Sequence, residues 1–232
     1  EDIIVTAGAK FAIYLAFHST LERGDKVIVI DPAWVTYEPA AEMAGAEVVR
    51  VSTKESRGFH PDLREIEEAM DDKVKILVIN SPCNPTGAVY KEAEIKRIAE
   101  IARDYNSLVL SDEPYEYLVF DGEHYSPGSD FENVITVNSF SKSFAMTGWR
   151  LGYVTGPKEI LEGIKKIYQH SLSCVTAFAQ SGGLEALESK ETKLEVQKML
   201  TGYEQRRELA ITKIKESNYL EQEIKPEGAF YC

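Results

Sequence analysis

Short apolar runs alternate along this chain with segments of helical periodicity, and this alternation constrains the fold more than any other feature. Seven runs are rich in β-branched residues, and most are continuously apolar, as in strands that are buried on both faces. They span residues 3–6, 26–30, 48–52, 75–80, 108–111, 134–138 and 151–155. Strands that alternate with helices predict an α/β fold with a seven-stranded, mostly parallel sheet sandwiched by helices.

Helical patterns fill the gaps between these runs. Residues 11–21 carry apolar side chains at helical spacing, and residues 61–70 open with a proline in the first turn. Residues 92–105 place their apolar side chains on one face.

The last third of the chain is mainly helical. We expect helices at 158–170 and 176–189, and a long, heavily charged helix at 192–215. Residues 1–190 are predicted to form a large domain. Residues 191–232 are predicted to form a connecting helix and the start of a smaller C-terminal α+β domain.

Composition argues against several classes of function. The formal net charge of −12 disfavours nucleic acid or an anionic membrane as a partner, because such binding needs clustered Lys and Arg. The three Cys and four His form no close pair and no metal-ligand spacing, so no metal site is expected. Unpaired cysteines fit a reducing compartment, which predicts a cytoplasmic protein. No apolar run approaches the length needed to span a bilayer.

Polar and aromatic residues gather directly after the expected strands. In an open α/β sheet, ligands bind beyond the carboxyl ends of the strands. The first strand leads into Gly8-Ala9-Lys10 at a helix start, where free amides and the helix dipole suit an anion. Later strand ends carry Trp34, Asn84, Asp112 with Tyr115, and Ser139-Phe140-Ser141-Lys142, with Arg150 eight residues after the lysine.

Each of these residues has an ordinary structural explanation when it is taken alone. Asn84-Pro85-Thr86-Gly87 is typical of a turn, Asp112 of a helix N-cap and Trp34 of packing. Lys142 is typical of an exposed lysine, and Arg150 of a surface ion pair. Their joint occurrence at successive strand ends favours one shared site instead. A lysine held there, away from bulk water, can lose its proton and condense with an aldehyde.

Three motifs together resemble one known family. Asn84-Pro85-x-Gly87, Asp112-x-x-Tyr115, and Ser139-x-Ser141-Lys142 with Gly148-Trp149-Arg150 are similar to the class I/II aminotransferases of pyridoxal-phosphate (PLP) fold type I. The similarity extends along the whole chain, which resembles the central segment of such an enzyme. It implies that the sheet is the PLP-binding large domain, that pyridoxal 5′-phosphate is the cofactor and that the full-length protein is a homodimer.

The resemblance also implies a role for each residue. Lys142 would form a Schiff base with the cofactor aldehyde and later move the proton between substrate and cofactor. Asp112 would keep the pyridine nitrogen protonated, and Tyr115 would contact the ring oxygen; these three are the implied catalytic residues. The remaining implied cofactor-binding residues are Gly8, Ala9, Lys10, Trp34, Asn84, Ser139, Ser141 and Arg150.

The implied activity is amino transfer from an amino acid of the aspartate or aromatic class to a 2-oxo acid such as 2-oxoglutarate. Two alternatives share the motifs: another fold type I enzyme, such as a carbon–sulfur β-lyase, and the PLP-sensing domain of a transcription regulator. The arginine that binds the substrate carboxylate in this family has no match in the sequence. We therefore expect the segment alone to keep the cofactor-binding fold but to have little or no transaminase activity.

Overall fold

The computed structural model describes residues 3–217, 219 and 224–231, and its centre is a seven-stranded sheet of order β1-β7-β6-β5-β4-β2-β3. β7 is antiparallel to both of its neighbours, and the other neighbouring pairs are parallel. All seven expected strands and the mostly parallel sheet are therefore confirmed. The strands are β1 (Ile3–Thr6), β2 (Lys26–Asp31), β3 (Glu47–Ser52), β4 (Val74–Asn80), β5 (Leu108–Asp112), β6 (Val134–Ser139) and β7 (Gly152–Thr155).

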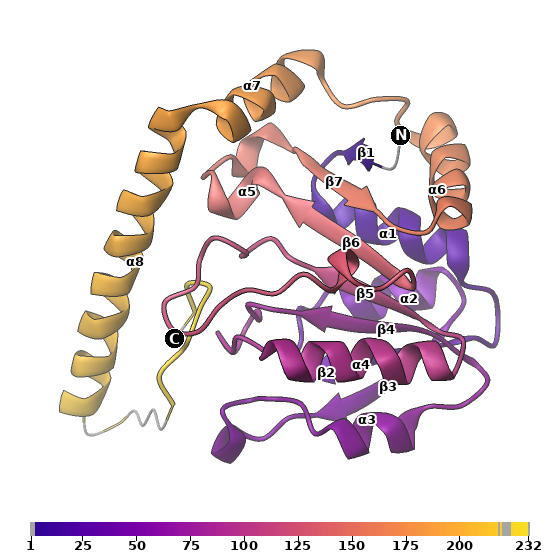
Figure 1. Cartoon of the computed structure of the whole chain (residues 1–232), viewed down its shortest axis with the longest axis horizontal. Helices are drawn as coiled ribbons and strands as arrows, with labels where there is room; N and C mark the ends of the chain where they lie inside the picture. Colours follow the sequence, from indigo (N-terminus) through magenta and orange to yellow (C-terminus); the bar gives the residue numbers. More distant parts are fainter. Residues whose placement is uncertain (1–2, 218, 220–223, 232) are drawn as a thin grey trace.

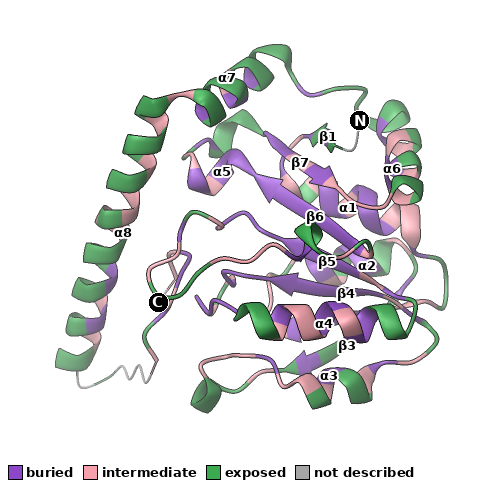
Figure 2. Ribbon diagram, viewed as in Figure 1, coloured by how far each residue is buried: buried purple, intermediate pink, exposed green. Residues whose placement is uncertain are grey.

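Helices cover both faces of the sheet (Figure 1). One face carries α1 (Ala9–Thr20), α2 (Tyr37–Met43) and α6 (Lys158–Ser171), and the other carries α3 (Leu63–Ala69) and α4 (Glu92–Asp104). Successive residues of a strand point to opposite faces, so Val27 and Val29 pack with the first group, whereas Ile28 and Ile30 pack with the second. Burial on both faces, visible along the central strands in Figure 2, explains why the strand sequences are continuously apolar.

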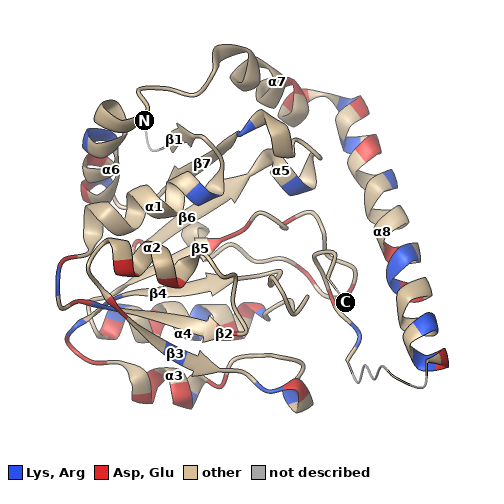
Figure 3. Cartoon of the chain, turned by 180° about the vertical axis from the view of Figure 1, so that it is seen from behind, with Lys and Arg blue, Asp and Glu red and all other residues tan. Residues whose placement is uncertain are grey.

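A long helix stands apart from these layers, beside the carboxyl ends of the strands (Figure 1). This helix, α8 (Lys190–Glu216), carries charges of both signs along its length (Figure 3). No helix within the described residues is both long and apolar enough to cross a membrane. The shorter elements are α5 (Phe140–Ser143), α7 (Ala177–Glu188), and the 3₁₀ turns η1 (Glu55–Arg57), η2 (Pro127–Ser129) and η3 (Thr147–Trp149).

Some boundaries differ from the expected ones for identifiable reasons. Pro61 precedes α3 and does not lie in its first turn, because Asp62 is the N-cap and its side chain accepts a hydrogen bond from the Arg64 amide. Ser189 ends α7 and also caps α8, so those two helices are separated by a single residue. The domain boundary at residue 190 stays a prediction, and it coincides with the start of α8.

Candidate active site

A cavity of about 340 Å³ opens at the carboxyl edge of the sheet. β4, β5 and β6 each contribute their last residue to its wall, and α1 contributes its first turn. The volume is in the range of small-ligand sites. The cavity is lined by Ala9, Lys10, Trp34, Tyr37, Asn80, Asn84, Asp112, Pro114, Tyr115, Ser139, Ser141, Lys142, Thr147, Arg150 and Tyr231.

The structure brings the predicted site residues together, because all of them except Gly8 line this one cavity. Gly8 lies directly behind the wall, where a Cβ atom would come within 2.7 Å of Arg150 Nη2. Its φ of +83° is also a conformation that residues with side chains rarely adopt. Because glycine has no side chain, this position leaves room for the guanidinium group of Arg150.

Asp112 is the last residue of β5 and is only 3% exposed. Its Oδ2 accepts a 2.6 Å hydrogen bond from the Tyr37 hydroxyl, whereas its Oδ1 has no partner among the described residues. Burial raises the pKa of Asp112 to about 7, and the hydrogen bond from Tyr37 works against this rise. The alternative interpretation of Asp112 as a helix N-cap is wrong, because it ends a strand and no helix follows it directly.

Lys142 lies in α5, directly after β6, and is half-buried. The Ser139 hydroxyl caps this short helix by accepting a hydrogen bond from the Ser141 amide at 3.1 Å. The cap orients the turn that carries Lys142 toward the cavity. The Lys142 Nζ lies 5.4 Å from the centre of the Phe230 ring.

Arg150 and Lys10 add further positive charge to the cavity wall. Arg150 has a φ of 52° and donates hydrogen bonds to the Thr147 and Ala7 carbonyl oxygens at 2.9 and 3.3 Å. Within the described part of the chain it makes no ion pair with a carboxylate, so its charge is available to an anion. The first turn of α1 lies beside it, and Lys10 there places its Nζ 5.1 Å from the centre of the Trp34 ring.

Tyr37, Asn80 and Tyr231 also line the cavity but were not predicted. A signal existed for two of them: Asn80 ends β4, and Tyr37 follows Trp34 by three residues at the start of α2. Tyr231 gave no local signal. Its hydroxyl meets the Tyr115 hydroxyl at 2.7 Å across 116 residues of chain.

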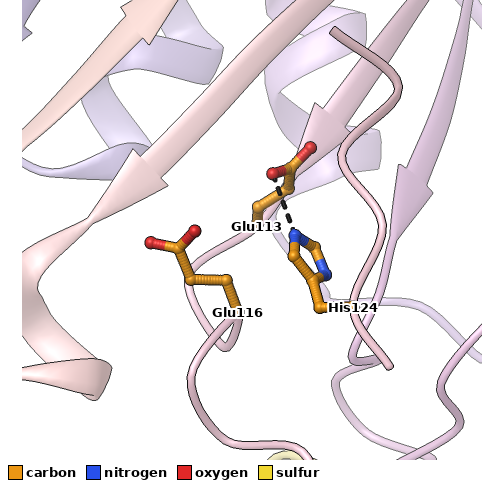
Figure 4. A group of neighbouring side chains, drawn as sticks. All are labelled: Glu113, Glu116 and His124. Carbon is orange, nitrogen blue, oxygen red and sulfur yellow. Dashed lines mark hydrogen bonds and ion pairs between the residues drawn. The ribbon is translucent and has the colours of Figure 1, made fainter. Parts of the chain in front are cut away.

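A second group of titratable side chains lies next to the cavity. Glu113, Glu116 and His124 have possible metal-ligand atoms within 4.8 Å of one another (Figure 4). Glu113 is already satisfied, because it accepts hydrogen bonds from the Ser111 and Ser126 hydroxyls and contacts His124 Nε2 at 3.1 Å. We interpret Glu113 as a buried carboxylate with its hydrogen-bond partners, and Glu116 as a neighbouring carboxyl group whose pKa burial raises. The expectation of no metal site rests on Cys and His spacing, does not cover carboxylates, and stays a prediction.

The two cysteines that the structure describes do not contribute to the cavity wall. Cys83 is buried and Cys174 is exposed, and both are free thiols, whereas Cys232 lies outside the described residues. Burial raises the pKa of Cys83, which disfavours the reactive thiolate form.

The strand order and the cavity at the carboxyl edge define an α/β protein of the fold type I class. A family model described as aminotransferase class I and II matches residues 1–232. The chain belongs to this family, and the predicted family is therefore confirmed.

Named relatives and solved structures agree with this assignment. The chain is 43% identical over 233 residues to an aspartate aminotransferase of Pyrococcus horikoshii, covering all of this chain and 59% of that protein. It is 40% identical to an aspartate/prephenate aminotransferase of Thermus thermophilus, covering all of this chain and 60% of that protein.

Among solved structures, it matches an aspartate aminotransferase from Thermus thermophilus with maleate, with a TM-score of 0.95 and 39% identity over 98% of this chain and 60% of that one. It also matches an aromatic aminotransferase from Pyrococcus horikoshii, with a TM-score of 0.94 and 38% identity over 98% of this chain and 61% of that one. The chain thus spans about three-fifths of the length of these relatives.

Proposed function

We propose that the full-length protein is a PLP-dependent aminotransferase that moves an amino group from an aspartate-class or aromatic amino acid to a 2-oxo acid such as 2-oxoglutarate. One observation carries the proposal: a half-buried lysine, Lys142, shares a cavity with the buried carboxylate of Asp112. The names of the relatives, which are aspartate, aspartate/prephenate and aromatic aminotransferases, support the same activity.

The residues of the cavity fit pyridoxal 5′-phosphate. Asp112 Oδ1 is buried and accepts no hydrogen bond within the described residues, so it can accept one from a protonated ring nitrogen. Arg150 and the amides at the start of α1 suit a phosphate, because a planar guanidinium and free N–H groups bind its oxygens well. The Ser139 and Ser141 hydroxyls line the same wall, and Trp34 offers a flat ring face.

When bound, the cofactor supplies an electron sink for the charge left on the substrate after its α-proton is removed. Lys142 would hold the cofactor covalently through Nζ until the amino group of the substrate displaces it, and the released amine would then accept and return that proton. Asn84 and Tyr115 would donate hydrogen bonds to the ring oxygen. Burial, together with the hydrogen bond to Tyr231, raises the pKa of Tyr115 far above its ordinary value, so the phenol keeps its proton at physiological pH.

Substitution of Tyr37 tests whether its hydrogen bond stabilises the ionised form of Asp112. Tyr37→Phe removes the hydrogen bond that lowers the pKa of Asp112, while burial, the main cause of the raised pKa, remains. We expect the pKa of Asp112 to rise further, and PLP affinity at neutral pH to fall by about tenfold or more, since a hydrogen bond to a charged group contributes about 1.5–3 kcal/mol. The measurement is a fluorescence titration with PLP at several pH values.

Tyr14→Phe is the matched control, because Tyr14 is a half-buried tyrosine of α1 that does not line the cavity. Equal affinity and an equal pH dependence in Tyr37→Phe and the wild type would refute this role.

An assay of amino transfer tests the activity itself. The full-length protein, incubated with aspartate or an aromatic amino acid and 2-oxoglutarate, should form glutamate and the matching 2-oxo acid in equal amounts. Pyruvate release from cysteine conjugates without amino transfer would favour a β-lyase. PLP binding without turnover of any amino acid would favour a sensor domain.

Assembly into a homodimer is also part of the proposal. Large apolar side chains are exposed on β1 and α7, including Ile3 at 62%, Phe178 at 73% and Leu184 at 57%. Exposed apolar groups of this kind support an interface with a second copy or with the rest of the full-length protein.

The cytoplasmic location stays a prediction.

A further inference from the structure

Residues 225–231, named here the C-terminal segment, return from the end of α8 to the carboxyl edge of the sheet (Figure 1). The Glu227 and Gly228 amides both donate to the Gly87 carbonyl oxygen, at 2.9 and 2.8 Å. The Phe120 amide donates to the Glu227 carbonyl oxygen, and the Ala229 amide donates to the Leu118 carbonyl oxygen, each at 2.8 Å. The segment is therefore bound by its backbone to loops that follow β4 and β5.

The fit between the two backbones leaves no room for side chains at two glycines. A Cβ atom on Gly228 would lie 2.8 Å from the Leu118 carbonyl oxygen, and one on Gly87 would lie 2.6 Å from Pro226 Cβ. Gly87 belongs to the same turn as Asn84, which lines the cavity. A shift of the C-terminal segment would therefore displace this turn and, with it, part of the cavity wall.

The far end of the segment contacts the proposed catalytic residues. The Tyr231 and Tyr115 hydroxyls are 2.7 Å apart, and the Phe230 and Tyr115 rings pack edge to face at 5.5 Å. Phe230 also lies under the Lys142 ammonium group. The position of this segment therefore decides which hydrogen bond the Tyr115 hydroxyl makes.

A histidine holds the near end of the segment. His60 Nδ1 lies 2.8 Å from Glu94 Oε2, and His60 Nε2 lies 3.3 Å from Glu227 Oε2. Neutral imidazole has one N–H group, so only the protonated ring can donate to both carboxylates at once. The Glu227 carboxylate also accepts from the Val89 amide at 3.0 Å, which orients it toward the ring.

The charges around His60 favour its protonated form. Hydrogen bonds to Glu227 and then Glu94 raise the pKa of His60 to about 9. Burial alone would raise the pKa of Glu227, but the bonds from His60 and from the Val89 amide lower it overall.

The other titratable or charged neighbours of this group come from separate elements. The charge of Lys91 lowers the pKa of Glu94, and the charge of Asp121 raises the pKa of Glu227. The Tyr90 ring lies 6.0 Å from the His60 ring. On the open side, His60 lines a small surface depression with Lys54, Arg57, Asp62 and Glu65.

We propose that His60 and Glu227 form a latch that positions Tyr231 against Tyr115, which makes His60 a positioning residue for a site that it does not touch. The effect on rate rests on the proposed aminotransferase function, whereas the latch itself can be measured without any assay of activity. Because the pKa of His60 is raised to about 9 in the folded protein, the latch is formed at neutral pH and is lost as the pH rises through about 9. Its contribution to the stability of the fold is fully present at about pH 6.5 and is lost over the same rise.

Hydrogen exchange on the full-length protein measures the latch directly. We expect protection of the amides of residues 227–229 to fall about tenfold in His60→Gln, because a charge-assisted hydrogen bond is lost from a partly exposed pair. His170→Gln is the control, because His170 is an exposed histidine near the end of α6. Glu227→Gln, which keeps the shape of the side chain, should reproduce the loss if His60→Gln folds poorly. Unchanged protection in both variants would overturn the latch.

A double-mutant cycle measures whether the latch acts through Tyr231. His60→Gln and Tyr231→Phe should each lower kcat several-fold with little change in KM for the amino acid, and the double variant should be no slower than Tyr231→Phe alone. The fall of the wild-type rate near pH 9 should be missing in His60→Gln. Losses that multiply in the double variant would refute positioning through Tyr231. A wild type without transaminase activity but with the expected exchange would refute the proposed function and leave the latch in place.

Discussion

Lys142→Ala is expected to abolish covalent attachment of PLP while leaving the fold intact. Lys142 makes no ion pair among the described residues and is not part of the hydrophobic cluster around Phe140, so truncation removes no core packing. The same change removes the group that accepts and returns the substrate proton. Loss of a positioned proton-transfer group alone lowers rates by about 10²–10⁴-fold.

Borohydride reduction followed by peptide mass analysis measures this attachment. The wild-type protein should be yellow, should lose that colour on reduction and should carry the label on Lys142. Lys10 is the matched comparison, because it is the other lysine among the residues lining the cavity but is exposed beside Trp34. Label on Lys10, or an unchanged absorption spectrum in Lys142→Ala, would contradict the assignment.

Asp112→Ala is expected to weaken PLP binding and to lower the rate of amino transfer by several orders of magnitude. Asp112 is preorganised by the Tyr37 hydroxyl and by β5, and losing such a group in a water-poor site typically costs a few kcal/mol. Stopped-flow measurement of each half-reaction in the full-length protein would give the size of the loss. A rate equal to that of the wild type would rule out a role for this carboxylate.

The ionised carboxylate of Asp112 should destabilise the cofactor-free protein. Burial raises the pKa of Asp112 from 3.8 to about 7, so ionisation is less favourable in the folded state than in the unfolded state. The destabilisation therefore develops as the pH rises from about 4 to about 7 and is complete above that range. Its size is on the order of a few kcal/mol.

Asp112→Asn removes the charge and keeps the shape. We expect it to raise the Tm of the cofactor-free protein at about pH 8, with no gain near pH 4. Asp72→Asn serves as the control, since Asp72 is exposed on the surface. An unchanged or lower Tm at about pH 8 would show that burial of this carboxylate carries no such penalty.

The strands were predictable because they are short, most are rich in β-branched residues, and the central ones are buried on both faces. β2 is an example, since all of its central residues, from Val27 to Ile30, are buried. Helix α5 was not predicted because its four residues are too few to show a helical period, and the seven-residue α2 was not predicted either. The boundary at α3 depended on Asp62, an N-cap that the proline beside it had obscured.

The candidate site was predictable where a polar or charged residue lies at the end of a strand or directly after it. Asp112, Ser139 and Lys142 were found in this way, because parallel strands bring their carboxyl ends to one edge of the sheet. Tyr37 was missed although it makes the shortest hydrogen bond of Asp112, because α2 was not expected and its direction could not be inferred.

The amino-acid sequence by itself determined the class of fold, the family and the edge of the sheet at which the site lies. These depend on local patterns: the period of apolar residues and the residue type at each strand end. Only the tertiary structure decided that Asp112 Oδ1 has no hydrogen-bond partner among the described residues, that Tyr231 meets Tyr115 and that His60 joins two carboxylates. Those contacts join segments up to 167 residues apart, and their hydrogen bonds depend on side-chain directions that no local pattern records.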